Sequence, residues 1–318
     1  MAPQNLLLFG ATGQIGSFIL SAILSARDQF GRIVVYTSPR TAETKASDLD
    51  PLKEKGIEII VGEIEDGKAV EKAYEGINTV ISALGRNALA QQIPLIRLAA
   101  ASSSVKWFLP SEYGTDIAYG PQSAHEKPHQ QKLRVRAVLE TEIARQDLEY
   151  TYVVTGPFAE MYLHQTPGVE EAGGWDVKRQ RAVLLGDAGT EKISLTTMKD
   201  VGTLVLCTLL TDSPETRNRA LCVNSFTTSP AEIHAEFERQ TGGQPWESVS
   251  RTPLAWLREL EAAAWEAGNP AATVLTLRRI WTEGGTLYAQ RDNGVIGEPG
   301  TMGLQEVVAN EIRRVGSL

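Results

Sequence analysis

The sequence predicts a doubly wound α/β fold on a parallel sheet, followed by a second, smaller domain in the C-terminal half. Short apolar runs alternate with helical patterns as far as about residue 155, and this alternation is typical of parallel strands joined by helices. The first run breaks into three spaced glycines and continues directly as an amphipathic helix. Beyond residue 155 the alternation ends and five of the six tryptophans follow, which indicates a unit of different architecture.

The predicted strands of the sheet are apolar nearly throughout. Strands of this kind have helices on both faces of the sheet, because neither row of side chains meets water. After the first strand, 6–9, the expected strands are 33–36, 57–61, 79–84, 106–109 and 150–154. Two later pieces are expected to return to the sheet, 198–210 as a helix and 220–223 as a strand. The predicted units are therefore 1–155 with 198–224, and 156–197 with 225–318.

Spaced glycines separate the first strand from the first helix. They allow a tight turn, close approach of a pyrophosphate to backbone N–H groups, and contact between helix and sheet. The helix that begins there presents partial positive charge and unpaired N–H donors at its N-terminus. The residues expected to contact a dinucleotide are Gly10, Thr12, Gly13, Gln14, Ile15 and Gly16. The alternative is a structural turn in another kind of α/β protein.

The end of the second strand predicts which dinucleotide is bound. Sites for NAD place an Asp or Glu there to bind the ribose 2′-hydroxyl. Here the chain reads Tyr-Thr-Ser-Pro-Arg over 36–40 and has no carboxylate. Ser38, Arg40 and Lys45 can instead contact a 2′-phosphate, so NADPH or NADP⁺ is the expected cofactor. The alternative for Arg40 is a solvated residue at a helix start.

The segments that follow two further strands are also expected to contribute to the site. Ligands of open α/β sheets lie in the crevice at the carboxyl ends of the strands. The residues expected beside the ribose and pyrophosphate are Ser82, Ala83 and Leu84. The next strand runs into a polar loop with Glu112, Tyr113 and Asp116. Loops at this crevice commonly carry catalytic groups, and a turn with solvated carboxylates is an equal alternative.

Lys132 lies on the inward face of the next predicted helix, which begins around Pro128. It precedes Val135 and Leu139 at helical spacing, which places its side chain beside apolar residues near a strand exit. Such a lysine either extends its ammonium to water or binds a ribose and polarises a substrate oxygen.

Composition excludes several classes of protein. The net charge of −8 argues against a nucleic-acid surface. The two cysteines, Cys207 and Cys222, have no metal-type spacing, so we expect buried thiols in a reducing compartment and no metal site. No apolar run reaches the length of a membrane span, and the first strand leaves no room for a signal peptide, so a cytoplasmic protein without membrane partners is expected.

The chain resembles the NmrA-like and isoflavone-reductase-like branch of the atypical short-chain dehydrogenases. The resemblance spans nearly the full length, and the matching segments are 10–16, 108–114, Lys132, 135–136, 150–153, 156–158 and 194–201. It implies a Rossmann domain that binds NADPH and a small C-terminal substrate domain. It also implies that Lys132 is the catalytic residue and that Gly156, Pro157 and Phe158 lie against the nicotinamide.

The chain departs from the pattern of these related enzymes at two positions. Short-chain dehydrogenases place a proton-donating tyrosine four residues before the lysine, where this chain has Pro128. The proton donor would then be Lys132 or a loop residue, the candidates being Tyr113, His125, Glu126 and His129. Plant reductases of this type commonly end the second strand with arginine, and Ser38 stands there instead.

Three functions are compatible with the sequence. The first is an NADPH-dependent reductase of a small, hydrophobic or aromatic metabolite, as in fungal-type secondary metabolism. The second is a redox-neutral isomerase that retains NADP(H), with acid and base drawn from Glu112, Tyr113, Asp116, Glu126 and Lys132. The third is an NADP(H)-sensing regulator. The residues expected to contact a small-molecule substrate are Tyr113, Asp116, Phe158, Tyr162 and Trp175.

Overall fold

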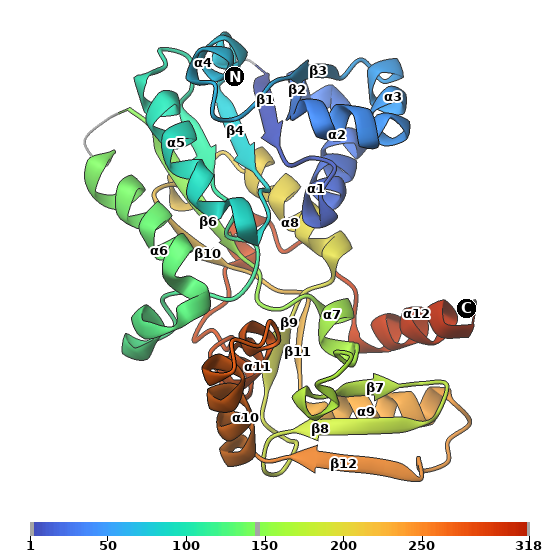
Figure 1. The fold of residues 1–318 in the computed structure, drawn as a ribbon. Coiled ribbons are helices and arrows are strands. Elements are labelled where there is room, and N and C mark those ends of the chain that lie inside the picture. The colour runs from blue at the N-terminus through green and yellow to red at the C-terminus, as the bar shows by residue number, and fades with distance from the viewer. Residues whose placement is uncertain (1–2, 144–146, 317–318) are drawn as a thin grey trace.

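Seven parallel strands form the central sheet of the computed structural model, which describes residues 3–143 and 147–316 (Figure 1). The strands follow the spatial order β10-β6-β5-β4-β1-β2-β3, so the chain winds outward from β1 in both directions. Their bounds are β1 (Gln4–Phe9), β2 (Phe30–Thr37), β3 (Glu58–Val61), β4 (Thr79–Ser82), β5 (Trp107–Leu109), β6 (Glu149–Val154) and β10 (Arg219–Cys222). The predicted doubly wound α/β fold is confirmed.

Side chains of β1 divide between two cores, one on each face of the sheet. Leu6 and Leu8 belong to the core under α1 and α8, whereas Leu7 and Phe9 belong to the core under α4, α5 and α6. Burial of each such side chain contributes about 1.5–3 kcal/mol, which explains why the strands are apolar on both faces. The helices of this unit are α1 (Gln14–Ser25), α2 (Pro39–Thr44), α3 (Ala46–Glu54), α4 (Gly67–Tyr74), α5 (Gln92–Ala101), α6 (Gln130–Ala137) and α8 (Met198–Leu210).

Element boundaries differ from the predicted ones at two places that matter for the site. β4 ends at Ser82 rather than at residue 84, because the chain turns there and brings the Ala83 carbonyl against Gly10. The helix predicted to begin around Pro128 starts as a 3₁₀ turn, Lys127–His129, and becomes α-helical only at Gln130.

The second unit contains two small sheets and packs below the carboxyl ends of the strands (Figure 1). Its strands are β7 (Gly174–Asp176), β8 (Arg181–Leu185), β9 (Ile193–Leu195), β11 (Phe226–Thr228) and β12 (Ser248–Thr252). Its helices are α7 (Ala159–Leu163), α9 (Pro230–Gln240), α10 (Leu254–Glu266), α11 (Ala272–Thr282) and α12 (Leu304–Gly316). Ser229 caps α9 by accepting from the N–H of Glu232 at 3.3 Å, as its sequence indicates.

Three later segments lie with the central sheet. Helix α8 packs against α1, where a Cβ on Gly202 would lie 2.4 Å from the Phe18 carbonyl oxygen, and β10 pairs with β6. The sequence pattern does not predict that the third of these segments lies against the sheet. Ile296 packs into the core under α1 and α8, and the backbone N–H of Asp292 donates to the Cys222 carbonyl at 2.7 Å. Residues around 292–296 therefore lie against the sheet, not within the second unit.

Candidate active site

A cavity of about 360 Å³ lies where the carboxyl ends of β1, β4, β5 and β6 meet the second unit. The turns and loops that follow these strands form one side, and α7 and α11 form the other. The predicted site residues that line it are Gly13, Gln14, Ile15, Ala83, Leu84, Tyr113, His129, Lys132, Gly156, Pro157 and Phe158. The cavity therefore joins the glycine-rich turn, Lys132 and the segment after β6, which are far apart in sequence.

The three glycines of the turn after β1 have different roles. Gly10 has a φ of +74°, and a Cβ there would lie 2.6 Å from the Ala83 carbonyl oxygen. A Cβ on Gly16 would lie 2.0 Å from the Gly10 carbonyl oxygen, so the close approach of α1 to the turn requires this glycine, and Gly16 does not line the cavity. Gly13 has an ordinary φ of −77°, and its nearest obstacle is the Gly10 carbonyl oxygen at 3.0 Å. Gly13 is thus the glycine that the fold needs least.

The N-terminus of α1 opens into the cavity. Gly13 is its N-cap and supplies no side-chain oxygen to the first N–H groups, and the first turn carries no acidic residue. These donors and the partial positive charge of a helix of 12 residues fit a phosphate group. The turn therefore has donors suited to a phosphate group, and its contact with the pyrophosphate of a dinucleotide stays a prediction.

A second cavity, of about 270 Å³, lies beside the ends of β1 and β2. Gly10, Thr12 and Ser38 line it, and Leu84 lines both cavities, so the two are adjacent. The Ser38 hydroxyl caps α2 by accepting from the N–H of Thr41 at 3.2 Å. The adjacent cavities suit an elongated ligand whose middle lies on the glycine-rich turn.

The charged residues around the second cavity differ from the predicted set. Arg40 is exposed on α2 and does not line the cavity. Lys45 instead donates its Nζ to the Thr12 carbonyl and so lies directly beside the turn. Glu63 and Glu65, which follow β3, also line the cavity. Although β2 ends without a carboxylate, Glu63 and Glu65 therefore bring negative charge to this cavity.

Lys132 presents an ammonium group to the first cavity from the first turn of α6. Its Nζ donates to the backbone carbonyl of Glu112 at 3.0 Å and lies 3.8 Å from the carboxylate of the same residue. Burial lowers the pKa of Lys132, while the Glu112 carboxylate opposes this shift and the nearby Arg136 and Arg86 guanidinium groups add to it. The ammonium is oriented but not neutralised by close contact with a carboxylate.

Glu112 lies behind Lys132 and does not line the cavity. Its side chain is 1% exposed and accepts from Arg136 Nη2 at 2.8 Å. Asp116, the other carboxylate of this loop, lies 3.6 Å from Arg136 Nη1 and is also outside the cavity lining. Both carboxylates pair with the same arginine, Arg136, and neither lines the cavity.

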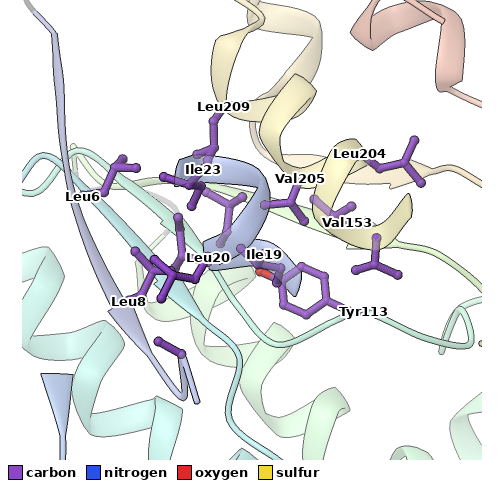
Figure 2. Close-up of a cluster of buried hydrophobic side chains, with 14 of the residues drawn as sticks. Leu6, Leu8, Ile19, Leu20, Ile23, Tyr113, Val153, Leu204, Val205 and Leu209 are labelled. Atoms are coloured by element: carbon purple, nitrogen blue, oxygen red, sulfur yellow. The ribbon is translucent and has the colours of Figure 1, made fainter. Parts of the chain in front are cut away.

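Tyr113 lines the cavity but packs mostly into the core of the sheet. Figure 2 shows its ring among apolar side chains of α1 and α8, including Ile19 and Val205. Its hydroxyl is buried and has no hydrogen-bond partner within the described residues. Burial raises the pKa of this phenol, as does the adjacent Glu112 carboxylate, so the hydroxyl stays protonated and can donate.

Glu126, predicted as a catalytic candidate, is held elsewhere. Its carboxylate accepts from Arg279 of α11 at 2.7 Å and from the Tyr119 hydroxyl at 3.2 Å. It does not line the cavity, and Arg279 also pairs with Glu261 and Glu283. The structure corrects this prediction: Glu126 joins the loop before α6 to the second unit.

Three further predicted site residues lie outside the cavity lining. Tyr162 and Trp175 are 3% and 4% exposed and belong to the core of the second unit, with ring centroids 6.2 Å apart. Tyr162 lies on α7 and Trp175 on β7, and both rings pack into this core and not toward the cavity. Ser82 is fully buried at the end of β4, with its hydroxyl unpartnered among the described residues. These residues support the walls and are not placed to contact a ligand directly.

Sequence reasoning missed the residues that the second unit contributes. Trp281 and Leu277 of α11 line the cavity, and the Trp281 indole N–H donates to the Thr115 hydroxyl at 2.8 Å. Arg86, which follows β4, was missed as well and lines the same cavity. The helical pattern of α11 identifies a buried face but not the distant loop that it contacts, so no local signal could have found Trp281 and Leu277. Arg86 could have been found, because it closely follows the predicted strand exit at Ser82.

The first cavity combines apolar walls with positive charge. Lys132 and Arg86 line it, and no carboxylate of the described residues does. Within residues 3–143 and 147–316, no group of three or more His, Cys, Asp or Glu side chains is arranged to hold a metal ion. No helix in the same ranges is long and apolar enough to cross a membrane. The arrangement can stabilise negative charge on an oxygen of a mostly apolar molecule.

The sheet order, the turn and the cavity define a dinucleotide-binding type of α/β protein, and comparisons identify the family. Residues 3–258 match the NmrA-like family model, so the chain belongs to the NmrA-like family and the resemblance seen in the sequence is confirmed. An isoflavone reductase homolog from Solanum tuberosum is 31% identical over 252 residues, which cover 76% of each protein. Phenylcoumaran benzylic ether reductase Pyrc5 from Pyrus communis is 28% identical over 246 residues, again 76% of each.

A solved structure has the same fold over nearly the whole chain. Leucoanthocyanidin reductase from Vitis vinifera, in a binary complex with NADPH, superposes with a TM-score of 0.79 at 23% identity. The superposition covers 97% of this chain and 99% of that one. The likeness includes the second unit as well as the sheet.

Proposed function

We propose that this protein is an NADPH-dependent reductase of a small, hydrophobic or aromatic metabolite. The observation that carries the proposal is the position of Lys132, whose ammonium lies in an apolar-walled cavity that the phosphate-binding turn also lines. The names of the relatives, a phenylcoumaran benzylic ether reductase and an isoflavone reductase homolog, support this class of substrate.

Each part of the site has a proposed task. The N-terminus of α1 holds the pyrophosphate of NADPH, and Ser38 and Lys45 face its adenosine half. NADPH, when bound, supplies a hydride from its nicotinamide ring. Lys132 stabilises the negative charge that develops on the substrate oxygen, which is commonly the largest single contribution to catalysis.

The surrounding residues exclude water and supply a proton. Phe158, Leu277 and Trp281 form apolar parts of the wall, and the low polarity strengthens the field of the Lys132 ammonium. We assign proton donation to the Lys132 ammonium, because Glu112 and Glu126 are both held by arginines and the Tyr113 hydroxyl is buried where its ring packs into the core under α1 and α8.

The test measures product and NADPH together. Purified protein is incubated with NADPH and a panel of isoflavones and benzylic ethers, and absorbance at 340 nm is compared with product formed. Equal amounts of NADPH consumed and product formed are expected. Lys132→Met should lower kcat by about a hundred- to a thousandfold, whereas Lys127→Met, at an exposed neighbouring lysine, should not. Product without NADPH consumption would identify a redox-neutral enzyme and refute the reductase.

A further inference from the structure

His129 is a buried histidine in the wall of the first cavity, at the end of the 3₁₀ turn Lys127–His129. Its side chain is 2% exposed. Nδ1 lies 3.1 Å from the carbonyl oxygen of Ser123. Nε2 is also buried, and it has no hydrogen-bond partner among the residues that the structure describes. One ring nitrogen thus lacks the partner that buried polar atoms normally have.

The contact with Ser123 determines what Nε2 can do. A carbonyl oxygen only accepts hydrogen bonds, so Nδ1 carries the hydrogen and Nε2 presents a lone pair. Burial lowers the pKa of His129, the bond to Ser123 opposes that shift, and the Lys132 ammonium adds to it. The ring is therefore neutral near pH 7, and Nε2 is an acceptor that needs a donor.

Two donors that line this cavity, Lys132 and Ser111, have other partners, and a third, the Tyr113 hydroxyl, is buried where its ring packs into the core under α1 and α8. The Lys132 ammonium donates to the Glu112 carbonyl at 3.0 Å. The Ser111 hydroxyl donates to the backbone carbonyl of Leu84 at 2.9 Å. Because the imidazole lines the cavity and none of these donors turns to it, a molecule bound in the cavity is the natural source of the missing hydrogen.

We infer that His129 is a specificity-determining residue whose Nε2 accepts a hydrogen bond from a hydroxyl group of the substrate. The inference rests on the proposed function, because it takes the same cavity as the substrate site, and it adds a requirement for the ligand. The substrate carries a free hydroxyl on its aromatic part, and an O-methylated analogue is rejected because it leaves Nε2 buried and unpaired.

Binding of two matched probes tests the inference without turnover. The protein is saturated with NADP⁺, and 4-ethylphenol or 4-ethylanisole is titrated while tryptophan fluorescence is followed, since Trp281 lines the cavity. The phenol should bind about 10- to 100-fold more tightly than the ether. His129→Phe should remove this preference, and His125→Phe, at an exposed histidine four residues earlier, should keep it. Equal affinities in the unmodified protein, or no measurable binding of either probe, would overturn the inference.

Nitrogen-15 NMR of the histidine rings gives a readout that needs no variant to fold. The chain has four histidines, so the Nε2 resonance of His129 is resolvable. It should show an unprotonated nitrogen in the NADP⁺ complex and shift on addition of 4-ethylphenol but not of 4-ethylanisole. A protonated Nε2, or the same shift with both probes, would contradict the inference. Failure of NADPH consumption would refute the reductase while leaving the probe preference intact, so the two failures are distinguishable.

Discussion

The Lys132 ammonium donates to the backbone carbonyl of Glu112 at 3.0 Å and remains 3.8 Å from the carboxylate of that residue. Arg136 makes this separation possible, because its guanidinium takes the carboxylate at 2.8 Å. The lysine is thus fixed by a neutral carbonyl and keeps its charge available to the cavity.

Replacement of Arg136 should leave the Glu112 carboxylate buried without its main partner. For Arg136→Met we expect the free energy of unfolding to fall by about 3–5 kcal/mol, as when one partner of a buried ion pair is removed. The pKa of Lys132 should rise, because Arg136 now lowers it. Urea denaturation and the alkaline limb of the rate profile measure the two effects. Arg134→Met, at an exposed position of the same helix, is the control, and an equal loss in both variants would contradict the role of the pair.

The lowered pKa of Lys132 predicts how stability depends on pH. Its charged form is penalised by burial in the folded state, and this penalty is fully present below the folded-state pKa. The penalty disappears as pH rises toward the ordinary lysine pKa of about 10.4, so this residue should make the free energy of unfolding rise with pH in that interval. Urea denaturation of the unmodified protein and of Lys132→Met across this range should give curves that diverge. Parallel curves would show that the ammonium is not desolvated.

Substitutions at Gly13 should distinguish effects on NADPH binding from effects on folding. Because its φ is ordinary, Gly13→Ala should fold, and the contact of 3.0 Å between the added Cβ and the Gly10 carbonyl oxygen should cost less stability than the contact of 2.0 Å at Gly16. A larger side chain, in Gly13→Val, should abolish NADPH binding by occupying the space of the pyrophosphate. Thermal unfolding and fluorescence titration measure the two properties. Gly16→Ala should destabilise the protein instead, since its Cβ would lie 2.0 Å from a carbonyl oxygen. Normal NADPH binding by Gly13→Val would mean that the turn is only structural.

Preference for NADPH over NADH should depend on Lys45 more than on Arg40. A charge-assisted contact to the 2′-phosphate contributes about 1.5–3 kcal/mol, or roughly ten- to a hundredfold in affinity. Neither residue lines the second cavity, but Lys45 is partly buried and contacts the turn at the Thr12 carbonyl, whereas Arg40 is exposed. Titration of both cofactors should therefore show a reduced preference in Lys45→Met and an unchanged one in Arg40→Ala. The reverse result would restore Arg40 as the recognition residue.

Local patterns predict the sheet and the turn because each depends on neighbours in sequence. The apolar run of β1 and the glycine spacing define where the strand ends and α1 begins. Lys132 is also predictable locally, because helical spacing gives its face. The sequence therefore predicts the part of the site formed by the glycine-rich turn and Lys132.

The rest of the site depends on contacts between distant segments. Tyr162 on α7 and Trp175 on β7 follow Phe158 in sequence but pack into the core of the second unit. No periodic pattern in the sequence distinguishes a ring that faces this core from one that faces the cavity. Glu126 looks like an available carboxylate in the sequence because its partner, Arg279, lies 153 residues away. Trp281 reaches the cavity through a contact with Thr115, 166 residues away. Pairings of this range are set by the packing of the two units.

The segment around Asp292 has a consequence for association between copies of the chain. β10 is an edge strand, and exposed edges invite pairing with another strand. Asp292 covers this edge: its backbone N–H donates to the Cys222 carbonyl, and its carboxylate accepts from the Cys222 N–H at 2.8 Å and pairs with Arg219 at 2.7 Å. A strand of a second copy could pair with β10 only after displacing Asp292 and breaking these hydrogen bonds and this ion pair. Asp292 therefore protects this edge against aggregation by strand addition.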